Sequence, residues 1–408
     1  MRDMYSGYAG IDFGPVLLES TSGYIERNDR GFGPLKLPFP GVITLTVDGN
    51  SEIFSQEVRL VSQSEGPWKW IAGVIYQDAE NVEGVRLAGG PPRNEISTYG
   101  TKSYAVFGEV SREFMDGRLI PLVGLRYFTD ERDFLTVNRV NGQAFKTSDT
   151  FESVNPRFNL SYKPSEDALI YANIAKGFRS GTFNTQAAVA AAAPLPAGLT
   201  VDPDSLWSYE VGTKLSLLDN RLKFEASVYY FKWSDQQLNF SGAGNVQIIV
   251  NGGEATGRGL DYGVTWATPV DGLILAASGN FNSTEYSDIQ NPAKFVGTGV
   301  IEGRQIASVP ESSHTVSATY TRPMNGAGLD LYLNGSYSYI SRQGDPTLTV
   351  LGDDHNLLKL RGGFSADKWG AYIFGDNVLD DDGAIQISGS GTMRYYPRVV
   401  GVEVTYDF

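Results

Sequence analysis

The sequence holds few side chains that could do chemistry together. Its 408 residues include no cysteine and only two histidines, His314 and His355. Without cysteine there are no disulfides, thiolate metal sites or cysteine nucleophiles, and two histidines cannot form a three-histidine metal site. No G-x-S-x-G sequence marks a nucleophile elbow near His314. We therefore expect a protein that is not an enzyme and that has no cofactor and no metal site.

Three polar segments could in principle bind an ion or a phosphate. Asp353, Asp354 and His355 could ligate a cation, although a solvated loop is the simpler interpretation. The acidic run 380–383 lacks the spacing and the distal glutamate of a calcium loop. The glycine-rich run 252–259 lacks the Lys-Ser/Thr signature of a phosphate loop, so it favours a strand entry. None of these segments predicts a ligand site.

Composition and charge limit the class of protein further. Hydrophobic residues make up 41% of the chain, which excludes wholesale disorder. The net charge of −14 and the pI of about 4.7 provide no basic surface, so nucleic acid is not an expected partner. No run of 18 apolar residues predicts a membrane-spanning helix, and the first residues do not have the pattern of a signal peptide.

Apolar and polar residues alternate along much of the chain. At the C-terminus Val400, Val402, Val404, Tyr406 and Phe408 share one face of a strand, because side chains alternate with period two. We expect about sixteen such strands. They lie near 13–27, 52–62, 67–78, 99–112, 118–130, 149–163, 167–179, 205–217, 221–237, 246–268, 272–286, 311–322, 328–342, 355–366, 369–378 and 394–408, the tenth being the least distinct.

The connections between these strands alternate in length. Seven are short polar turns. The long ones include 28–51, 79–98, 131–148, 180–204, 287–310 and 343–354. Short turns on one side and long loops on the other are typical of an antiparallel up-and-down transmembrane β-barrel. A propeller would show a repeat of roughly 40–50 residues, and none is present. A soluble solenoid is the other alternative, but its strands are much shorter.

Several segments resemble one family in its own order along the chain. The segments 54–60 (FSQEVRL), 105–110 (AVFGEV), 123–127 (VGLRY), 170–181 (IYANIAKGFRSG), 209–214 (YEVGTK) and 374–380 (FGDNVLD) are similar to strands of TonB-dependent outer-membrane receptors. Pro397, Arg398 and Phe408 resemble the closing strand. The resemblance implies a β-barrel in the outer membrane of a Gram-negative bacterium. Such a barrel imports a scarce ligand such as a ferric siderophore, cobalamin or a glycan.

The chain also departs from the family pattern. The resemblance covers about 16 of the 22 strands of a family barrel, with no plug domain and no TonB-recruiting segment. Residues 1–408 are thus expected to be the C-terminal portion of the barrel region. In the family the TonB complex acts through the plug, so no residue here is expected to contact it. The fragment would leave two open strand edges, whereas sixteen strands could instead close as a passive porin-like pore. A surface adhesin is a third possibility.

Some residues are candidates for particular roles. Tyr406 and Phe408 are expected to carry the signal read by the barrel-assembly machinery, as the family resemblance implies. Amphipathic rings prefer the headgroup level of a bilayer, and the candidates for such aromatic girdles in contact with outer-membrane lipid are Tyr76, Tyr127, Tyr230, Tyr262 and Trp266. The lumen-facing candidates are Arg126, Lys214, Glu225 and Asp261. The alanine-rich run from Gln186 to Leu199 could form a short helix in a long loop. The imported ligand is not indicated by the sequence.

Overall fold

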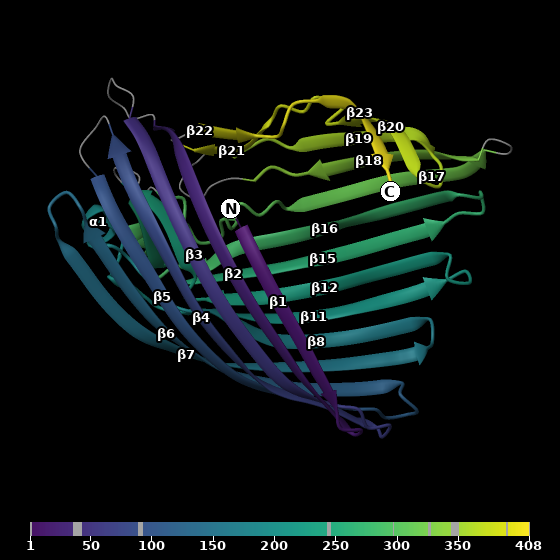
Figure 1. The fold of residues 1–408 in the computed structure, drawn as a ribbon, viewed down its shortest axis with the longest axis horizontal. Helices are drawn as coiled ribbons and strands as arrows, with labels where there is room; N and C mark the ends of the chain where they lie inside the picture. Colours follow the sequence, from purple (N-terminus) through teal and green to yellow (C-terminus); the bar gives the residue numbers. More distant parts are fainter. Residues whose placement is uncertain are drawn as a thin grey trace. The chain divides into compact units, whose positions relative to one another are not determined.

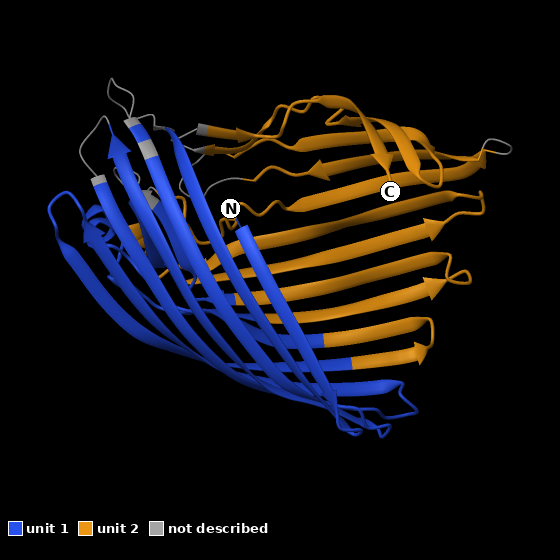
Figure 2. Cartoon of the chain, viewed as in Figure 1, with its two compact units in different colours: residues 1–160, 173–207, 233–252 blue, residues 161–172, 208–232, 253–408 orange. Residues whose placement is uncertain are grey.

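The computed structural model describes residues 2–35, 43–88, 93–242, 246–296, 298–324, 328–343, 351–388 and 391–407. The chain divides into two compact units (Figure 2). Unit 1 comprises residues 1–160, 173–207 and 233–252, and unit 2 comprises residues 161–172, 208–232 and 253–408. No helix in the described residues is long and apolar enough to span a membrane.

Long antiparallel strands make up unit 1 (Figure 1). They are β1 (Arg2–Asp12), β2 (Val16–Leu35), β3 (Ile43–Ser62), β4 (Trp68–Ala88), β5 (Arg93–Arg112) and β6 (Leu119–Asn138). Each of the strands β1 to β5 pairs with the next one in the sequence. Four further strands have residues in both units: β7 (Ala144–Ser165), β8 (Ala168–Arg179), β11 (Asp204–Leu217) and β12 (Leu222–Ser234).

Unit 2 continues the same up-and-down order with shorter strands. They are β15 (Glu254–Ala267), β16 (Leu273–Asp288), β17 (Ser312–Met324), β18 (Leu329–Ile340), β19 (His355–Ser365), β20 (Trp369–Asp376) and β23 (Val399–Tyr406). Together the strands of both units form a 17-stranded sheet. Strand β1 pairs with β2, and β23 pairs with β20.

Smaller elements fill the long connections. They are β9 (Thr182–Phe183), α1 (Gln186–Ala191), β10 (Thr200–Val201), β13 (Gln237–Gly242), β14 (Val246–Asn251), the 3-10 helix η1 (Pro292–Phe295), β21 (Ala384–Ser388) and β22 (Gly391–Arg394). Helix α1 confirms the predicted helix in the alanine-rich run, and β15 begins at Glu254, within the glycine-rich run interpreted as a strand entry.

Several predicted boundaries are wrong. The ranges 28–51, 79–98 and 131–148 were expected to be loops, but β2 to β7 extend through most of them. Strand β1 was not expected at all, and residues 246–251 pair with β13 in a separate hairpin instead of joining β15. The extensions mix apolar side chains with many charged and amide ones, and their backbone groups pair along the ladder throughout.

The strands of each unit have two chemically different faces. On β6 the outer face carries exposed Leu125 and Tyr127, whereas Asp130 and Phe134 on the opposite, inner face are buried. In unit 2 the exposed side chains of Val316, Leu333 and Ile373 mark the outer face. An apolar outer face and a polar inner face are the arrangement that a membrane barrel requires.

Candidate ligand-binding site

Short elements lie against the inner face of unit 1 at the end of the strands where the long connections begin. The Arg132 guanidinium donates a hydrogen bond of 2.9 Å to the carbonyl of Gly181, and it also pairs with Asp130 at 2.6 Å. Asp130 is only 1% exposed and accepts a further hydrogen bond of 2.7 Å from Ser103. A buried carboxylate needs such partners because burial of an unpaired charge is costly. This chain of contacts attaches the segment after β8 to β5 and β6.

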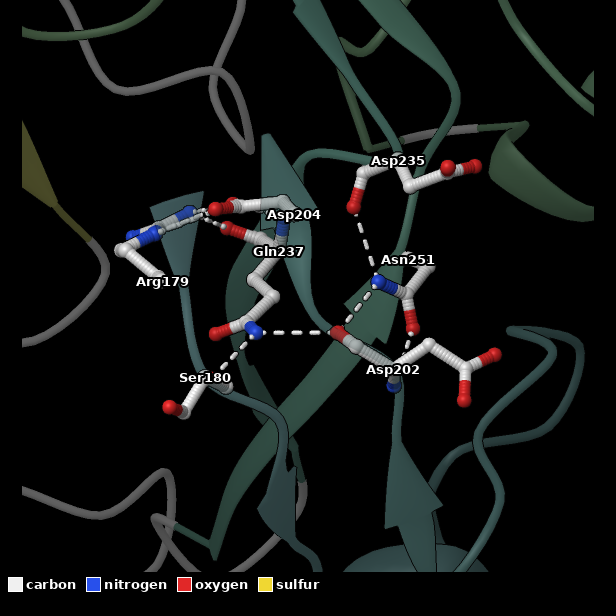
Figure 3. A network of polar contacts seen from close by, with 7 residues as sticks. All are labelled: Arg179, Ser180, Asp202, Asp204, Asp235, Gln237 and Asn251. Carbon is white, nitrogen blue, oxygen red and sulfur yellow. Dashed lines mark hydrogen bonds and ion pairs between the residues drawn. The ribbon is translucent and has the colours of Figure 1, made fainter. Parts of the chain in front are cut away.

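A second set of polar contacts connects the two ends of this segment (Figure 3). Arg179, the last residue of β8, forms an ion pair with Asp204, the first residue of β11, through both its Nε and its terminal nitrogen. Asp204 is 2% exposed, and its carboxylate also accepts a hydrogen bond of 3.1 Å from the backbone N–H of Gln237. Charge-assisted pairs of this kind are the strong hydrogen bonds of proteins. The ion pair therefore closes the 180–203 segment into a loop.

Two amide side chains extend the network in Figure 3 to the β13–β14 hairpin. The Gln237 side chain donates to the carbonyls of Ser180 and Asp202, at 3.0 and 2.9 Å. The Asn251 side chain donates to the carbonyls of Asp202 and Asp235 and accepts from the N–H of Asp202. Side chains thus satisfy backbone groups of Ser180, Asp202 and Asp235 that lie outside the large sheet.

Asn184 fixes the middle of the segment. It is 2% exposed, and its amide nitrogen donates to the carbonyls of Gly198 and Ile249 at 2.8 and 2.7 Å. Its amide oxygen accepts a hydrogen bond of 2.9 Å from the N–H of Ile249. The next residue, Thr185, caps α1 by accepting a hydrogen bond from the N–H of Ala188. One asparagine therefore holds β9, the residues before β10 and β14 together.

Aromatic packing adds an apolar anchor beside these polar contacts. The Phe183 ring is 5% exposed and stacks on Phe134, with ring centroids 6.0 Å apart. Phe134 also contacts Tyr99 at 4.9 Å. We refer to the segment 180–203 together with the β13–β14 hairpin as the inner layer of unit 1. Polar contacts and aromatic rings together hold this layer on strands β5 and β6.

A cavity of about 600 Å³ lies between the inner layer and strands β3 to β5. Its polar lining includes Asn81, Glu83, Glu95, Ser97, Tyr99, Asn184, Asn239 and Gln247, and its apolar lining includes Val85, Phe183, Phe240 and Ile249. Glutamates are present among the described lining residues, but no lysine or arginine is. A pocket of this size with aromatic rings and a few convergent polar groups is typical of a small-molecule site.

The structure places the lumen-facing candidates on the polar faces of their strands. Arg126 lies on the inner face of unit 1 with its guanidinium over the ring of Phe128. Lys214 and Glu225 approach each other at 4.0 Å in unit 2, and Asp261 lies opposite the outward run of Leu260 and Tyr262. None of these four residues lines the cavity in unit 1. Their role stays a prediction.

The aromatic candidates lie on the apolar faces. In unit 1 Tyr76 contacts Phe54 and Tyr104, with ring centroids 6.4 and 5.2 Å apart, and Tyr127 is 41% exposed. In unit 2 Tyr230 and Trp266 are also exposed, and the Tyr262 hydroxyl lies 3.2 Å from His314 Nδ1. These positions suit contact with lipid headgroups, and the girdle itself stays a prediction. Tyr406 ends β23 with an exposed ring, while Phe408 lies outside the described residues.

In the acidic segments considered as ion sites, the carboxylates accept hydrogen bonds from other groups of the protein. Asp353 accepts a hydrogen bond from the N–H of Ala384, and Asp354 accepts one from the N–H of Arg342. Asp381 accepts bonds from the N–H groups of Asn356 and Gly383 and lies 3.0 Å from His355 Nδ1. Within the described residues no group of three potential ligands is placed to hold a metal ion.

The loop that carries these carboxylates shows pKa shifts. Burial raises the pKa of Asp381, but the hydrogen bonds from Asn356, His355 and Gly383 outweigh it and leave that pKa below its ordinary value. The hydrogen bonds from the backbone and side chain of Arg398 lower the pKa of Asp380. Burial and the charge of Asp381 raise the pKa of Tyr395. The ionised carboxylates therefore hold this loop in place.

The residues that build the inner layer were not predicted as site residues. Arg179 stands within the family-like run 170–181, and Gln237 and Asn251 lie within predicted strands, whereas Asn184 and Asp204 lie in the predicted loop 180–204. Their partners are up to 65 residues away in the sequence. One signal was available: Asp204 and Gln237 stand at the ends of strands that the alternation does reveal.

The chain belongs to a known family, as comparison with other proteins shows. The model of the TonB dependent receptor-like β-barrel family matches residues 5–378. Members of this family are β-barrels of the outer membrane of Gram-negative bacteria, and this is where the chain is located. The antiparallel barrel fold and the family resemblance predicted from the sequence are thereby confirmed.

Individual relatives agree with this assignment. The probable TonB-dependent siderophore receptor PiuA of Acinetobacter baumannii is 23% identical over 207 residues, which are 48% of this chain and 26% of PiuA. The metal-pseudopaline receptor CntO of Pseudomonas aeruginosa is 23% identical over 201 residues, which are 49% of this chain and 25% of CntO.

Solved structures show the same fold at low sequence identity. The ferric yersiniabactin uptake receptor FyuA of Yersinia pestis superimposes with a TM-score of 0.83 at 16% identity and covers 100% of this chain. The siderophore receptor PiuA of Acinetobacter baumannii superimposes with a TM-score of 0.77 at 14% identity and covers 99%. The chain spans 61% and 64% of the lengths of these two receptors.

Proposed function

We propose that residues 1–408 form a barrel region that takes part in the import of a metal–siderophore complex across the outer membrane. The observation that carries this proposal is the cavity of about 600 Å³ under the inner layer of unit 1. Support comes from the relatives, whose names describe siderophore and metal receptors. A cobalamin or a glycan is the other ligand class that the family resemblance allows.

The lining of the cavity narrows the chemistry of the ligand. Glu83 and Glu95 are its charged groups within the described residues, and they are accompanied by amide and hydroxyl groups. Such a lining favours a neutral or positively charged complex over an anionic one, because an anion would meet like charge without a basic partner. We therefore expect hydroxamate-type ferric complexes to bind better than ferric citrate.

Uptake in this proposal depends on partners outside the matched strands. TonB-dependent transport needs a plug and contact with TonB, and we do not assign either to the barrel strands described here. The barrel-assembly machinery, acting on a C-terminal signal that includes Tyr406 and Phe408, and outer-membrane lipid complete the set of proposed partners. We also propose that the chain has no catalytic activity, since His314 contacts the Tyr262 hydroxyl on the apolar face of its strand and His355 contacts the carboxylate of Asp381.

Binding measurements on the native protein in detergent test the ligand site. The probes are the iron(III) complexes of a hydroxamate siderophore, a catecholate siderophore and citrate. The matched variants are Ser97→Trp, which fills the cavity, and Ser111→Trp, which places the same side chain on the same face of β5 outside it. We expect Ser97→Trp to weaken binding of the hydroxamate complex at least about tenfold, and Ser111→Trp to leave it unchanged. Equal affinities of both variants would contradict the proposal.

Conductance and energy dependence separate import from passive flow. A passive pore would conduct ions in a planar bilayer and take up solute without a proton-motive force. A receptor barrel would do neither. Uptake of the iron complex by cells that persists after the proton-motive force is collapsed would favour the pore.

A further inference from the structure

The outer face of unit 2 contains a hollow that the ligand site does not explain. Two open grooves of about 710 and 700 Å³ lie on this face, and both include Ala318 and Gly335 in their lining. Ala318 on β17 and Gly335 on β18 are directly paired across the strands. Two of the smallest side chains therefore lie side by side and form a common floor.

Large side chains form the walls around this floor. Along the same cross-strand row Leu275 pairs with Ala318, and Leu360 pairs with Gly335. Val316 and Tyr337 lie one step towards the long loops, and Tyr320 and Leu333 lie one step towards the short turns. All six of these wall residues are apolar or aromatic, so the hollow has the shape and chemistry of an acyl-chain site.

A positive charge lies at the turn end of the hollow. Arg322 follows Tyr320 on the same face of β17, about 7 Å further along the strand. It pairs across the strands with Leu331 and forms no ion pair with any residue that the structure describes. One step beyond, Trp369 and Tyr406 are paired and exposed, as aromatic residues at a headgroup level are. Arg322 lies two residues before the end of β17, next to the short turn.

We propose that this surface binds one anionic glycerophospholipid of the leaflet at the short-turn side, with an acyl chain on Ala318 and Gly335 and its headgroup at Arg322. Burial of apolar area does not select this site, because the surrounding lipid is equally apolar. Selection comes from packing into the hollow and from the guanidinium, which recognises phosphate well. The proposal depends on the location in the outer membrane but not on which ligand is imported.

Native mass spectrometry of the protein extracted from outer membranes in mild detergent tests this proposal. The probes are phosphatidylglycerol and phosphatidylethanolamine with the same acyl chains. We expect one tightly retained phosphatidylglycerol per protein, favoured about fivefold over phosphatidylethanolamine, which corresponds to about 1 kcal/mol for one basic residue at a charged surface.

Three variants separate the parts of the site. Arg322→Gln should abolish the preference for phosphatidylglycerol while the acyl site remains. Ala318→Leu should reduce retention of both lipids at least about fivefold. Ala172→Leu is the matched control, because Ala172 lies between exposed Ile170 and Ile174 on the outer face of β8, outside both grooves. This variant should retain lipid like the native protein.

Specific results would overturn the proposal. Equal retention of the two lipids by the native protein, or a preference that survives in Arg322→Gln, would exclude the headgroup site. If the native protein is a dimer and Ala318→Leu retains as much lipid as the native protein, a second copy of the chain covers the hollow. If Ala318→Leu does not fold, Gly335→Ala provides the second test, since its added Cβ would first meet Leu360 at 3.4 Å. It should also weaken retention.

Discussion

Unit 1 and unit 2 hold their long connections by different kinds of contact. In unit 1 the inner layer is fixed by contacts between residues distant in sequence, such as Arg179 with Asp204 and Asn184 with Ile249, 25 and 65 residues apart. In unit 2 the loop after β20 combines a local bond between Asn377 and Asp381, four residues apart, with bonds to the loop before β19, such as that of Asp381 to Asn356. The unit 1 contacts use the nearly fully buried side chains of Asn184 and Asp204 and connect the 180–203 segment, the β13–β14 hairpin and the strands around a cavity, whereas the unit 2 contacts connect neighbouring loops at the strand ends.

Strands β2 to β6 of unit 1 are also longer than those of unit 2. Strands β2 to β6 contain 20 or 21 residues, whereas β18, β19 and β20 contain 12, 11 and 8. A tilted strand needs about 9–11 residues to cross the hydrocarbon of a membrane. Strands β2 to β6 therefore project well beyond it, and the cavity is lined by parts of β3 to β5 near their long connections. Four variants test whether the distant contacts of unit 1 are the stronger ones.

Asn184→Ala should have the largest effect. It leaves two carbonyls and one N–H without their partner in a buried site, and each loss costs about 1–3 kcal/mol, so we expect about 3 kcal/mol in total after relaxation. Hydrogen exchange of the amides in 182–201 measures the free energy of local opening. The control Asn239→Ala removes an exposed amide whose side chain hydrogen-bonds to Gln247 in the part of the chain that the structure describes, and it should change opening by less than about 0.5 kcal/mol. Similar exchange in both variants would refute the role of Asn184.

Asp204→Asn should have the second largest effect on the stability of the inner layer. The substitution keeps the shape but removes the charge that pairs with Arg179, and we expect a loss of about 2 kcal/mol in the stability of the inner layer. Asp202→Asn is the matched control, since only the backbone of Asp202 takes part in the network. Thermal unfolding in detergent and exchange of residues 180–203 measure both. If Asp202→Asn loses as much stability as Asp204→Asn, the ion pair with Arg179 does not hold the inner layer, and the contrast between the two units fails.

Asp381→Asn should give a smaller, pH-dependent effect in unit 2. Because the pKa of Asp381 is lowered on folding, its stabilisation is present above the unfolded value of about 4 and is lost as the pH falls through the lower folded value. The difference in unfolding midpoint between native protein and variant should therefore be constant from about pH 7 to 5 and shrink at about pH 3. Asp382→Asn is the control and should show no such trend. A difference in unfolding midpoint that grows as the pH falls would contradict a lowered pKa of Asp381 in the folded protein.

Arg30→Ala should have the smallest effect. Arg30 pairs with Asp48 at 2.5 Å where β2 and β3 project, but both side chains are more than half exposed. Exposed ion pairs contribute about 0–1 kcal/mol and are screened by salt. We expect a change in unfolding free energy below about 1 kcal/mol that disappears in high salt. A larger change would mean that the projecting strands depend on surface pairs as well as on the inner layer.

The sequence predicted the fold better than the site. The alternation of Val400, Val402, Val404 and Tyr406 and the family-like run 170–181 were enough for the up-and-down barrel and its family, because one apolar face is required wherever a strand meets lipid. The cavity could not be predicted, since Asn184 and Asp204 lie in a predicted loop and Gln237 at the end of a predicted strand, where alternation carries no information about partners.

By itself the sequence determined which face of each strand is apolar, the order of the strands and the family. The lengths of β2 to β7, the β13–β14 hairpin and the inner layer were decided only by the tertiary structure. The physical reason is that backbone ladders extend wherever a neighbouring strand is available, whatever the side chains. Buried amides and carboxylates find partners far along the chain, and only the folded structure brings those partners within hydrogen-bonding distance.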